Sequence, residues 1–210
     1  MEKGKLITFE GIDGSGKTTQ IRYLDDYLRS LGFSTLLLRE PGGTRIGEGI
    51  RRLLLDSRFT EMTSETELFL FEAARAQLIR EIVRPALDRG VWVISDRFHD
   101  STVAYQGYGR GLDVRLIRDL NQLAMGGTVP DLTILLELPQ DTRSARLDER
   151  HEDGRSDRLD VEPDAFKQRV CQGFRAIARE EPSRVVSIRS QEEKEETARL
   201  IREQVRSRLL

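Results

Sequence analysis

Eleven residues near the N-terminus contain a pattern that could bind the phosphates of a nucleotide. Gly11 is followed, after four residues, by Gly16, Lys17 and Thr18, which is the spacing G-x-x-x-x-G-K-[ST] of a phosphate-binding loop. Glycines let successive backbone N–H groups point at one anion, the lysine reaches the β- and γ-phosphates, and the hydroxyl can ligate Mg²⁺. The residues expected to contact the nucleotide are Gly11, Ile12, Asp13, Gly14, Ser15, Gly16, Lys17, Thr18 and Thr19.

The segments on either side of this loop support that interpretation. Residues 5–9 read as a short buried strand, and after the loop apolar residues recur at helical spacing, at Ile21, Leu24, Leu28 and Leu31. Gly32 follows, where a helix commonly stops. Strand, glycine-rich loop and helix in this order place phosphates at a helix N-terminus. A chance glycine-rich turn is the alternative.

Two carboxylates and one arginine are further candidates for chemistry. Asp13, inside the loop, either steers Mg²⁺ or the acceptor phosphate, or accepts backbone N–H bonds in the turn. Asp96, at the end of an expected strand, either holds Mg²⁺ or caps the next segment. Arg97 needs an anion, because an unpaired guanidinium is costly to bury. Asp96, Glu40 or a substrate phosphate could supply it.

Two expected helices carry arginines at regular spacing. Phe71 and Arg75 are four residues apart and so share a face. Phe71 alone would be a core residue, but Arg75 interrupts an otherwise apolar stripe, which favours both side chains facing a planar ligand. A second set shares another helix face and leads into a charged loop: Arg143, Arg146 and Arg150. The alternative for this set is a solvated face paired with nearby carboxylates.

The elements that must position these residues alternate along the chain. Strands are expected at residues 5–9, 33–38, 91–95, 132–138 and 184–188, and helical patterns follow each of them. Ser64 and Glu67 match a capping box at the start of a long helix that Pro85 bends, and Asp113 caps a later helix. Residues 151–160 read as a mobile loop. We therefore expect residues 1–210 to form a single α/β domain with a five-stranded parallel sheet and helices on both faces.

This topology gathers the candidates. Ligands of such sheets bind at the carboxyl ends of the strands. The phosphate-binding loop, the loop at residues 40–44 and the pair Asp96 and Arg97 all follow strands. The sequence therefore predicts that they line one crevice.

Composition limits the class of protein. The formal net charge is −2 over 210 residues, which gives no case for binding nucleic acid or a membrane surface. A single cysteine, Cys171, excludes a disulfide framework within the chain and fits a cytosolic protein. No apolar run approaches the ~20 residues of a membrane span. Residues 1–5 lead directly into the first strand, so we expect no signal peptide.

Five stretches in this order resemble thymidylate kinases of the bacterial kind. They are FEGIDGSGKTT at residues 9–19, REPGGT at 39–44, DRF at 96–98, STVAYQG at 101–107 and DRLD at 157–160. Asp160 stands where the family usually has glutamate. The resemblance covers residues 6 to about 180. The first stretch is shared with many NTPases, whereas the Pro-Gly-Gly loop, Asp-Arg-Phe and Tyr-Gln-Gly in this order are specific to the family.

The resemblance implies transfer of the ATP γ-phosphoryl group to dTMP, in a cytosolic homodimer, with Mg²⁺ held by Thr18 and Asp96. Phe71 would stack on thymine, Arg75 would donate to its O4, and Arg51 and Arg97 would hold the dTMP phosphate. The full set implied for dTMP is Asp13, Glu40, Pro41, Arg51, Phe71, Arg75, Arg97, Ser101, Thr102, Tyr105 and Gln106. Thr102 and Gln106 would meet the base edge and Tyr105 the sugar.

The resemblance also implies a mobile lid at about residues 142–160. Members of the family take a catalytic arginine from the phosphate-binding loop or from the lid, and Gly14 and Ser15 supply none. The implied catalytic residues are Lys17, Asp13, Arg97, Arg146 and Arg150, with Arg155 and Arg158 as further lid candidates.

Two other functions remain open at this point. One is a kinase for a different nucleoside monophosphate, against which the pair Phe71 and Arg75 argues. The other is a nucleotide-dependent switch that binds a partner protein. A GTPase switch would carry an Asn-Lys-x-Asp motif for reading guanine, and the sequence contains none.

Overall fold

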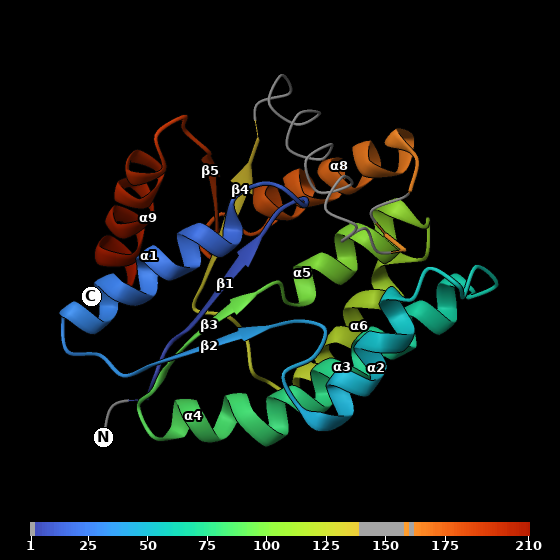
Figure 1. Ribbon diagram of the computed structural model, residues 1–210, viewed down its shortest axis with the longest axis horizontal. Helices are drawn as coiled ribbons and strands as arrows, with labels where there is room; N and C mark the ends of the chain where they lie inside the picture. The colour runs from blue at the N-terminus through green and yellow to red at the C-terminus, as the bar shows by residue number, and fades with distance from the viewer. Residues whose placement is uncertain (1–2, 139–157, 160–161) are drawn as a thin grey trace.

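Five parallel strands form one sheet at the centre of the computed structural model, which describes residues 3–138, 158–159 and 162–210. The strands are β1 (Leu6–Glu10), β2 (Thr35–Arg39), β3 (Trp92–Asp96), β4 (Leu132–Glu137) and β5 (Val185–Arg189). Their order across the sheet is β2-β3-β1-β4-β5 (Figure 1). The expected five-stranded parallel sheet is therefore confirmed.

Four of the five strands end one residue later than the sequence predicts. Their last residues are charged, namely Glu10, Arg39, Asp96 and Arg189. The prediction stopped each of these strands before its charged residue, but backbone pairing continues to it, as in the pairing of Arg39 with Asp96. Charged side chains are thus fixed at the carboxyl edge of the sheet by the ladder itself.

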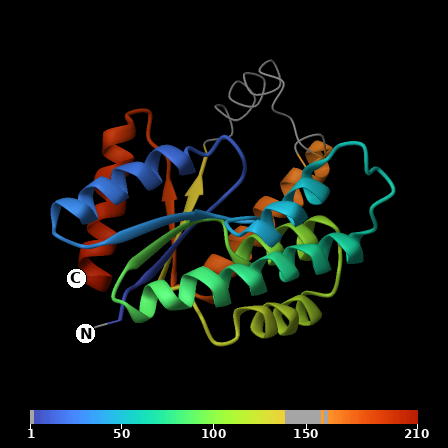
Figure 2. The ribbon, with the colours of Figure 1, turned by 60° about the horizontal axis from the view of Figure 1, so that its bottom comes forward.

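Helices cover both faces of the sheet, as expected. α1 (Lys17–Ser30) and α9 (Lys194–Leu209) pack together on one face. The other face carries α3 (Ser64–Leu78), α4 (Arg84–Asp88), α5 (His99–Thr102), α6 (Val114–Met125) and α8 (Asp164–Glu180). α2 (Arg45–Leu55) packs on α3, which lies beside α6 (Figure 2).

Alternate residues of the central strands enter two different cores. Ile7 and Phe9 of β1 pack with α1 and α9, whereas Leu6 points to the opposite side and packs near α4. β4 divides in the same way, with Ile134 facing α1 and α9 and Leu135 facing α8. Because both faces are buried, the strands read as continuous apolar runs rather than alternating ones.

The helix ends test several expectations. Asp113 caps α6 by accepting a hydrogen bond from Arg115 N, as predicted. The capping box at Ser64 is wrong by one residue: Thr63 is the N-cap, and its hydroxyl accepts from Thr66 N. Glu67, the predicted partner in that box, instead points into the protein. The expected bend at Pro85 takes the form of a π-helical segment, η1 (Ile79–Val83), between α3 and α4.

A further helical stretch was not predicted. α5 runs directly into a second π-helical segment, η2 (Val103–Gly109). Its buried residues are Val103, Ala104, Gln106, Gly107 and Gly109, whereas Tyr105 and Tyr108 are half-buried. An i→i+5 segment shifts the side-chain positions relative to an α-helix, and such segments are frequent at functional sites.

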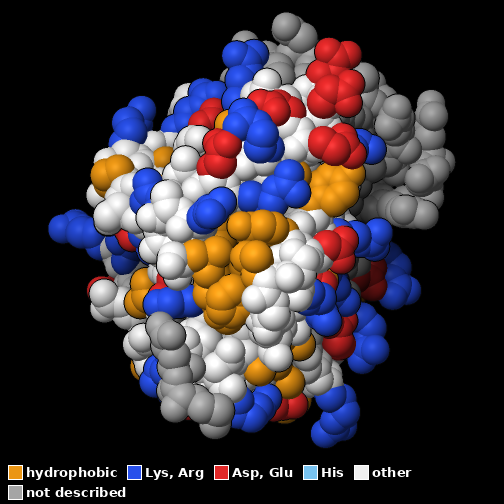
Figure 3. All heavy atoms as spheres, turned by 90° about the vertical axis from the view of Figure 1, so that its left-hand side faces the viewer, with side chains coloured by type: hydrophobic (Ala, Val, Ile, Leu, Met, Phe, Trp, Pro, Cys, Tyr) orange, Lys and Arg blue, Asp and Glu red, His pale blue; other side chains and the backbone are white. Residues whose placement is uncertain are grey.

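Charge is mixed on the face of the molecule shown in Figure 3. Basic and acidic side chains are interspersed there around a central hydrophobic patch. This face therefore presents no continuous basic stripe of the kind that binds nucleic acid. No helix in the described part of the chain is long and apolar enough to cross a membrane.

A buried ion pair anchors α5 to the sheet. Arg184, just before β5, donates to both carboxylate oxygens of Asp100 at 2.7 and 2.8 Å. The same guanidinium donates to Thr133 on β4, whose hydroxyl also bonds Thr8 on β1. Arg184 is 8% exposed and Asp100 is 2% exposed. Since Asp100 precedes Ser101, this pair fixes the start of the segment that carries several predicted site residues.

Removing one member of this pair should destabilise the protein strongly. Arg184→Met leaves the Asp100 carboxylate buried without its cation, and we expect the free energy of unfolding to fall by about 3–5 kcal/mol. Urea denaturation with an unchanged m-value measures this. Asp100→Leu combined with Arg184→Met should lose much less than the two single changes added together. A single-variant loss below about 1 kcal/mol contradicts the anchoring role.

Candidate active site

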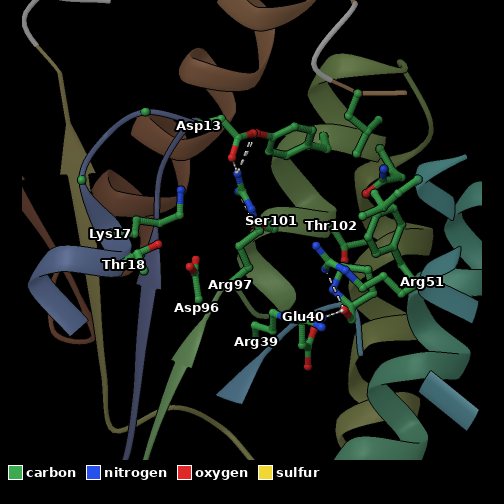
Figure 4. A pocket seen from close by; sticks show the side chains of 18 of the residues that line it. Asp13, Lys17, Thr18, Arg39, Glu40, Arg51, Asp96, Arg97, Ser101 and Thr102 are labelled. Carbon is green, nitrogen blue, oxygen red and sulfur yellow. Dashed lines mark hydrogen bonds and ion pairs between the residues drawn. The ribbon is translucent and has the colours of Figure 1, made fainter. Parts of the chain in front are cut away.

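A cavity of about 370 Å³ opens at the carboxyl ends of β1, β2 and β3. The predicted site residues that line it are Asp13, Gly14, Gly16, Lys17, Thr18, Thr19, Glu40, Pro41, Arg51, Phe71, Asp96, Arg97, Ser101, Thr102, Tyr105 and Gln106. Its volume lies in the range of small-ligand sites. Figure 4 shows Lys17 and Thr18 on one side of the cavity and Arg51 on the other. The predicted crevice is therefore present.

Sequence reasoning missed three residues that line the cavity. These are Arg39 at the end of β2, Leu55 at the end of α2, and Leu159. Arg39 could have been found, since it follows an expected strand. Leu159 lies within the DRLD stretch at 157–160, but its side chain was not singled out. Leu55 carries no signal in the sequence, because an apolar residue at a helix end is usually assigned to packing.

The phosphate-binding loop is held in a curled form by its own lysine. Lys17 Nζ donates to the carbonyl oxygens of Gly11 and Ile12, each at 3.1 Å. Gly16, which precedes α1, has φ of 92°, where a side chain is strained. A Cβ at Gly11 would lie 2.4 Å from Leu136 O. Burial, and next the charge of Arg97, lower the pKa of Lys17.

Arg97 pairs with Asp13, which is none of the three anions considered from the sequence. Its Nη2 donates to both Asp13 oxygens at 3.0 and 3.1 Å (Figure 4). Further bonds reach Gly11 O, Ser101 Oγ and Tyr105 Oη. Although burial works against its charge, Tyr105 and Asp13 help to raise the pKa of Arg97. This cation therefore stays charged beside the phosphate-binding loop.

The backbone of Arg97 is itself unusual. In the described part of the chain, Arg97 is the only residue other than glycine with a positive φ, at 68°. Glu10 holds the residues that follow: its carboxylate accepts from Phe98 N at 2.8 Å and Ser101 N at 3.2 Å. Burial, and next the charge of Asp100, raise the pKa of Glu10 to about 8. Positive φ at a bulky residue is a costly conformation that clusters at functional sites.

Thr18 and Asp96 could hold Mg²⁺ between them. Both line the cavity, and Asp96 points to the side where Thr18 lies (Figure 4). In the described part of the chain, no group of three or more His, Cys, Asp or Glu side chains forms a metal site. Mg²⁺ needs no such cluster, because it binds through one or two protein oxygens together with water and substrate phosphates. A hydroxyl and a carboxylate therefore fit the ion.

The residues expected at the base also line the cavity. They are Phe71 of α3, Thr102 of α5 and Gln106 of η2, and Leu55 and Leu159 line the same cavity. Phe71 is half-buried, as an aromatic wall of a cavity should be. Tyr105 lines it too, and burial raises its pKa, so its hydroxyl stays neutral at pH 7.

Arg75 lies beneath the cavity rather than on its wall. It is 1% exposed, and its five N–H groups all have protein acceptors: Glu40, Glu72, Asn121, Phe98 O and Thr102 Oγ. Burial disfavours its charge, but Glu40 and Glu72 outweigh this and raise its pKa. The burial of Glu40 itself raises the pKa of its carboxyl group to about 7. The expectation that Phe71 and Arg75 both face the ligand thus holds for Phe71 alone in this structure.

Glu67 is the centre of a second buried cluster. It accepts from Gln106 Nε2 at 2.8 Å, and from Arg110 Nε at 3.1 Å and Nη2 at 3.0 Å. Arg158 Nη2 also donates to it. Burial works against the ionised form, but these hydrogen bonds outweigh it and lower the pKa of Glu67. The carboxylate is therefore charged and only accepts hydrogen bonds.

The lid candidates fall into two groups. Arg146, Arg150 and Arg155 lie outside the described residues. Arg158 is described, and it is engaged with α2 and α3: its Nε donates to Leu54 O at 3.1 Å, and it pairs with Glu67. Its guanidinium thus holds Leu159 against the cavity rather than reaching toward the phosphate-binding loop.

Comparison with known proteins agrees with this geometry. The family model for thymidylate kinase matches residues 9–201. The thymidylate kinase of Desulforudis audaxviator is 50% identical over 191 residues, covering 90% of this chain and 85% of the relative. That of Desulfovibrio desulfuricans is 50% identical over 187 residues, covering 87% and 86%.

A solved structure extends the likeness to three dimensions. The crystal structure of thymidylate kinase from Ehrlichia chaffeensis superposes with a TM-score of 0.78 at 35% identity, over 97% of this chain and 99% of that one. The fold, the motifs and the sequence comparisons therefore agree that this chain belongs to the thymidylate kinase family.

Proposed function

We propose that the two ends of the cavity bind the two substrates of a thymidylate kinase, with ATP at the phosphate-binding loop and dTMP toward α2 and α3. As a member of its family, the protein is an ATP-dependent phosphotransferase that converts dTMP to dTDP. The observation that supports this placement is one cavity lined both by Lys17 of the phosphate-binding loop and by Phe71 of α3. The single sheet supports the further proposal that residues 1–210 form one domain, and the family resemblance implies that the protein acts in the cytoplasm.

Lys17 and Arg97 carry the chemistry of the phosphate end in this proposal. Their donors contact the carbonyl oxygens of Gly11 and Ile12 and the carboxylate of Asp13. Phosphates offer these cations stronger acceptors, because an ionised partner shortens and strengthens the hydrogen bond. Phosphoryl transfer depends mainly on such positioning and on stabilising charge in the transition state. Arg51 faces Arg97 across the cavity and completes the set for the dTMP phosphate.

Mg²⁺ would be held by Thr18 and Asp96, and it would neutralise charge on the β- and γ-phosphates. Asp13 then steers the acceptor phosphate by holding Arg97. Glu40 and Pro41 close the cavity below the base, while Ser101 orients Arg97 through a bond of 3.1 Å. These roles follow from the positions of the side chains around one cavity.

Arg75 requires a particular arrangement if it is to read the base. A bond from its guanidinium to thymine O4 needs one of its five protein acceptors to move. Of these acceptors, Thr102 and Glu40 line the cavity, and the neutral Thr102 hydroxyl, whose Oγ1 lies 2.9 Å from Nη2, is a weaker acceptor than the Glu40 carboxylate. We therefore propose that Thr102 and the base carbonyl share this donor.

A homodimer is proposed on the surface of α2, α3 and α6. These three helices pack side by side, and each exposes large apolar side chains. The most exposed are Ile46, Leu53, Phe69, Leu116 and Leu123. Large apolar groups gathered on neighbouring helices mark interaction surfaces of soluble proteins. A second copy of the chain is the partner that the family resemblance implies.

Lys17→Met tests the phosphate end. The variant keeps the length of the side chain but removes the charge, so we expect kcat to fall by a factor on the order of 10² or more. Coupled detection of ADP formation with dTMP measures this. Circular dichroism supplies the control for folding, and a folded variant with near-normal turnover rejects the assignment.

Alanine variants of the lid arginines test the source of catalytic charge. Arg150→Ala, our first choice, and Arg146→Ala should lower kcat while KM for dTMP stays nearly unchanged, because the charge acts only in the transition state. Arg158→Ala should instead lower thermal stability, since it leaves Glu67 buried with one cation fewer. If the Arg146, Arg150 and Arg155 variants all keep full kcat, the lid does not supply the charge.

Leu123→Asp tests the dimer surface. Leu123 is 72% exposed on α6, so the change costs the monomer little but places a carboxylate in the proposed interface. We expect a dimer for the unmodified chain and a monomer for the variant in sedimentation velocity. Leu31→Asp, at a 48% exposed position after α1, is the matched control and should remain dimeric. A dimer that survives Leu123→Asp excludes this surface.

A further inference from the structure

The side-chain amide of Gln106 is held in one orientation, which decides whether it offers a ligand in the cavity a hydrogen-bond donor or an acceptor. It lines that cavity, and its amide has one donor atom and one acceptor atom. The donor, Nε2, is committed to Glu67 Oε1 at 2.8 Å in a buried hydrogen bond. Because a carboxylate cannot donate, the amide cannot rotate to place its oxygen on Glu67. The atom left to meet a ligand is therefore Oε1, an acceptor.

Glu67 is held in the form that enforces this polarity. Arg110 donates to both of its oxygens, and Arg158 donates to Oε2. Glu67 is 1% exposed, so water does not compete for its lone pairs. Within the described residues, the hydrogen bond of the Gln106 side chain is the one that Nε2 donates to Glu67.

From this geometry we propose that Glu67 is a specificity-determining positioning residue, which orients the Gln106 amide so that its oxygen selects a pyrimidine bearing N3–H. The inference rests on the proposed function and goes beyond it, because Glu67 lies behind the cavity wall and touches no substrate. Thymine and uracil carry N3–H and donate to Oε1. Cytosine has a lone pair at N3, so two acceptors would face each other.

Replacing Glu67 by glutamine should turn the Gln106 amide around, so that it offers the base a donor in place of an acceptor. The arginines only donate, and two of their bonds reach Oε2 whereas one, from Arg110 Nε, reaches Oε1, so the new amide loses least by placing its oxygen at the Oε2 position. Its nitrogen then faces Gln106, whose own oxygen turns to accept it. Gln106 Nε2, a donor, would now point into the cavity and suit N3 of cytosine.

The experiment compares kcat/KM for dTMP and dCMP on four variants. For Glu67→Gln we expect the dTMP-to-dCMP ratio to fall by about 10- to 100-fold, the effect of one mispaired buried polar group. Gln106→Met, which leaves the Glu67 ion pairs intact, should also lower the ratio. Arg110→Gln is the matched control: it weakens the same cluster but leaves the carboxylate on Gln106, so the ratio should not change.

The double variant Glu67→Gln with Gln106→Glu provides the rescue. Its new amide nitrogen would face a carboxylate at position 106, whose second oxygen again presents an acceptor to the base. The ratio should therefore recover toward that of the unmodified enzyme, while total activity need not. An unchanged ratio in folded Glu67→Gln, or an equal fall in Arg110→Gln, overturns the inference. Failure of the unmodified enzyme to phosphorylate dTMP would instead overturn the proposed function.

Discussion

The burial of Arg75 is the interaction on which the site depends. Its five N–H groups end on the loop after β2, on α3, on the segment after β3 and on α6. A guanidinium cannot lose its charge, so each acceptor must be present for the group to stay buried. The ion pair with Glu40 is only 2.8 Å long. This one side chain therefore fixes the relative positions of four segments that form the floor and walls of the cavity.

The phosphate end is organised differently, by a buried ammonium that contacts carbonyl oxygens. Lys17 is 6% exposed, and its ammonium rests on two carbonyl oxygens without a direct carboxylate partner in the described part of the chain. Such an arrangement favours any anion that enters, because charge–charge attraction is strong where water is excluded. The site is preorganised for phosphate, and the cost of that preorganisation is met by the rest of the fold.

The main features of the fold were predictable from the sequence because they depend on local patterns. Buried parallel strands read as apolar runs, and Gly11, Gly16 and Lys17 carry the loop in their spacing alone. The partners of buried charges were not predictable. Arg97 pairs with Asp13, and Glu67 turns inward rather than capping its helix, because both contacts join residues far apart in the chain. A pairing of that kind depends on packing, for which one sequence holds no signal.

The central claim is that this cavity selects a pyrimidine monophosphate by the polar edge of its base. The most direct measurement is kcat/KM of the unmodified enzyme with Mg-ATP and each of dTMP, dUMP and dCMP. The account predicts dTMP first, with dUMP detectable because one methyl group is worth only about 1–3 kcal/mol, and dCMP lower by a factor of roughly 10⁴. Comparable values for dCMP and dTMP would contradict it, because neither Arg75 nor Gln106 could then be reading the base.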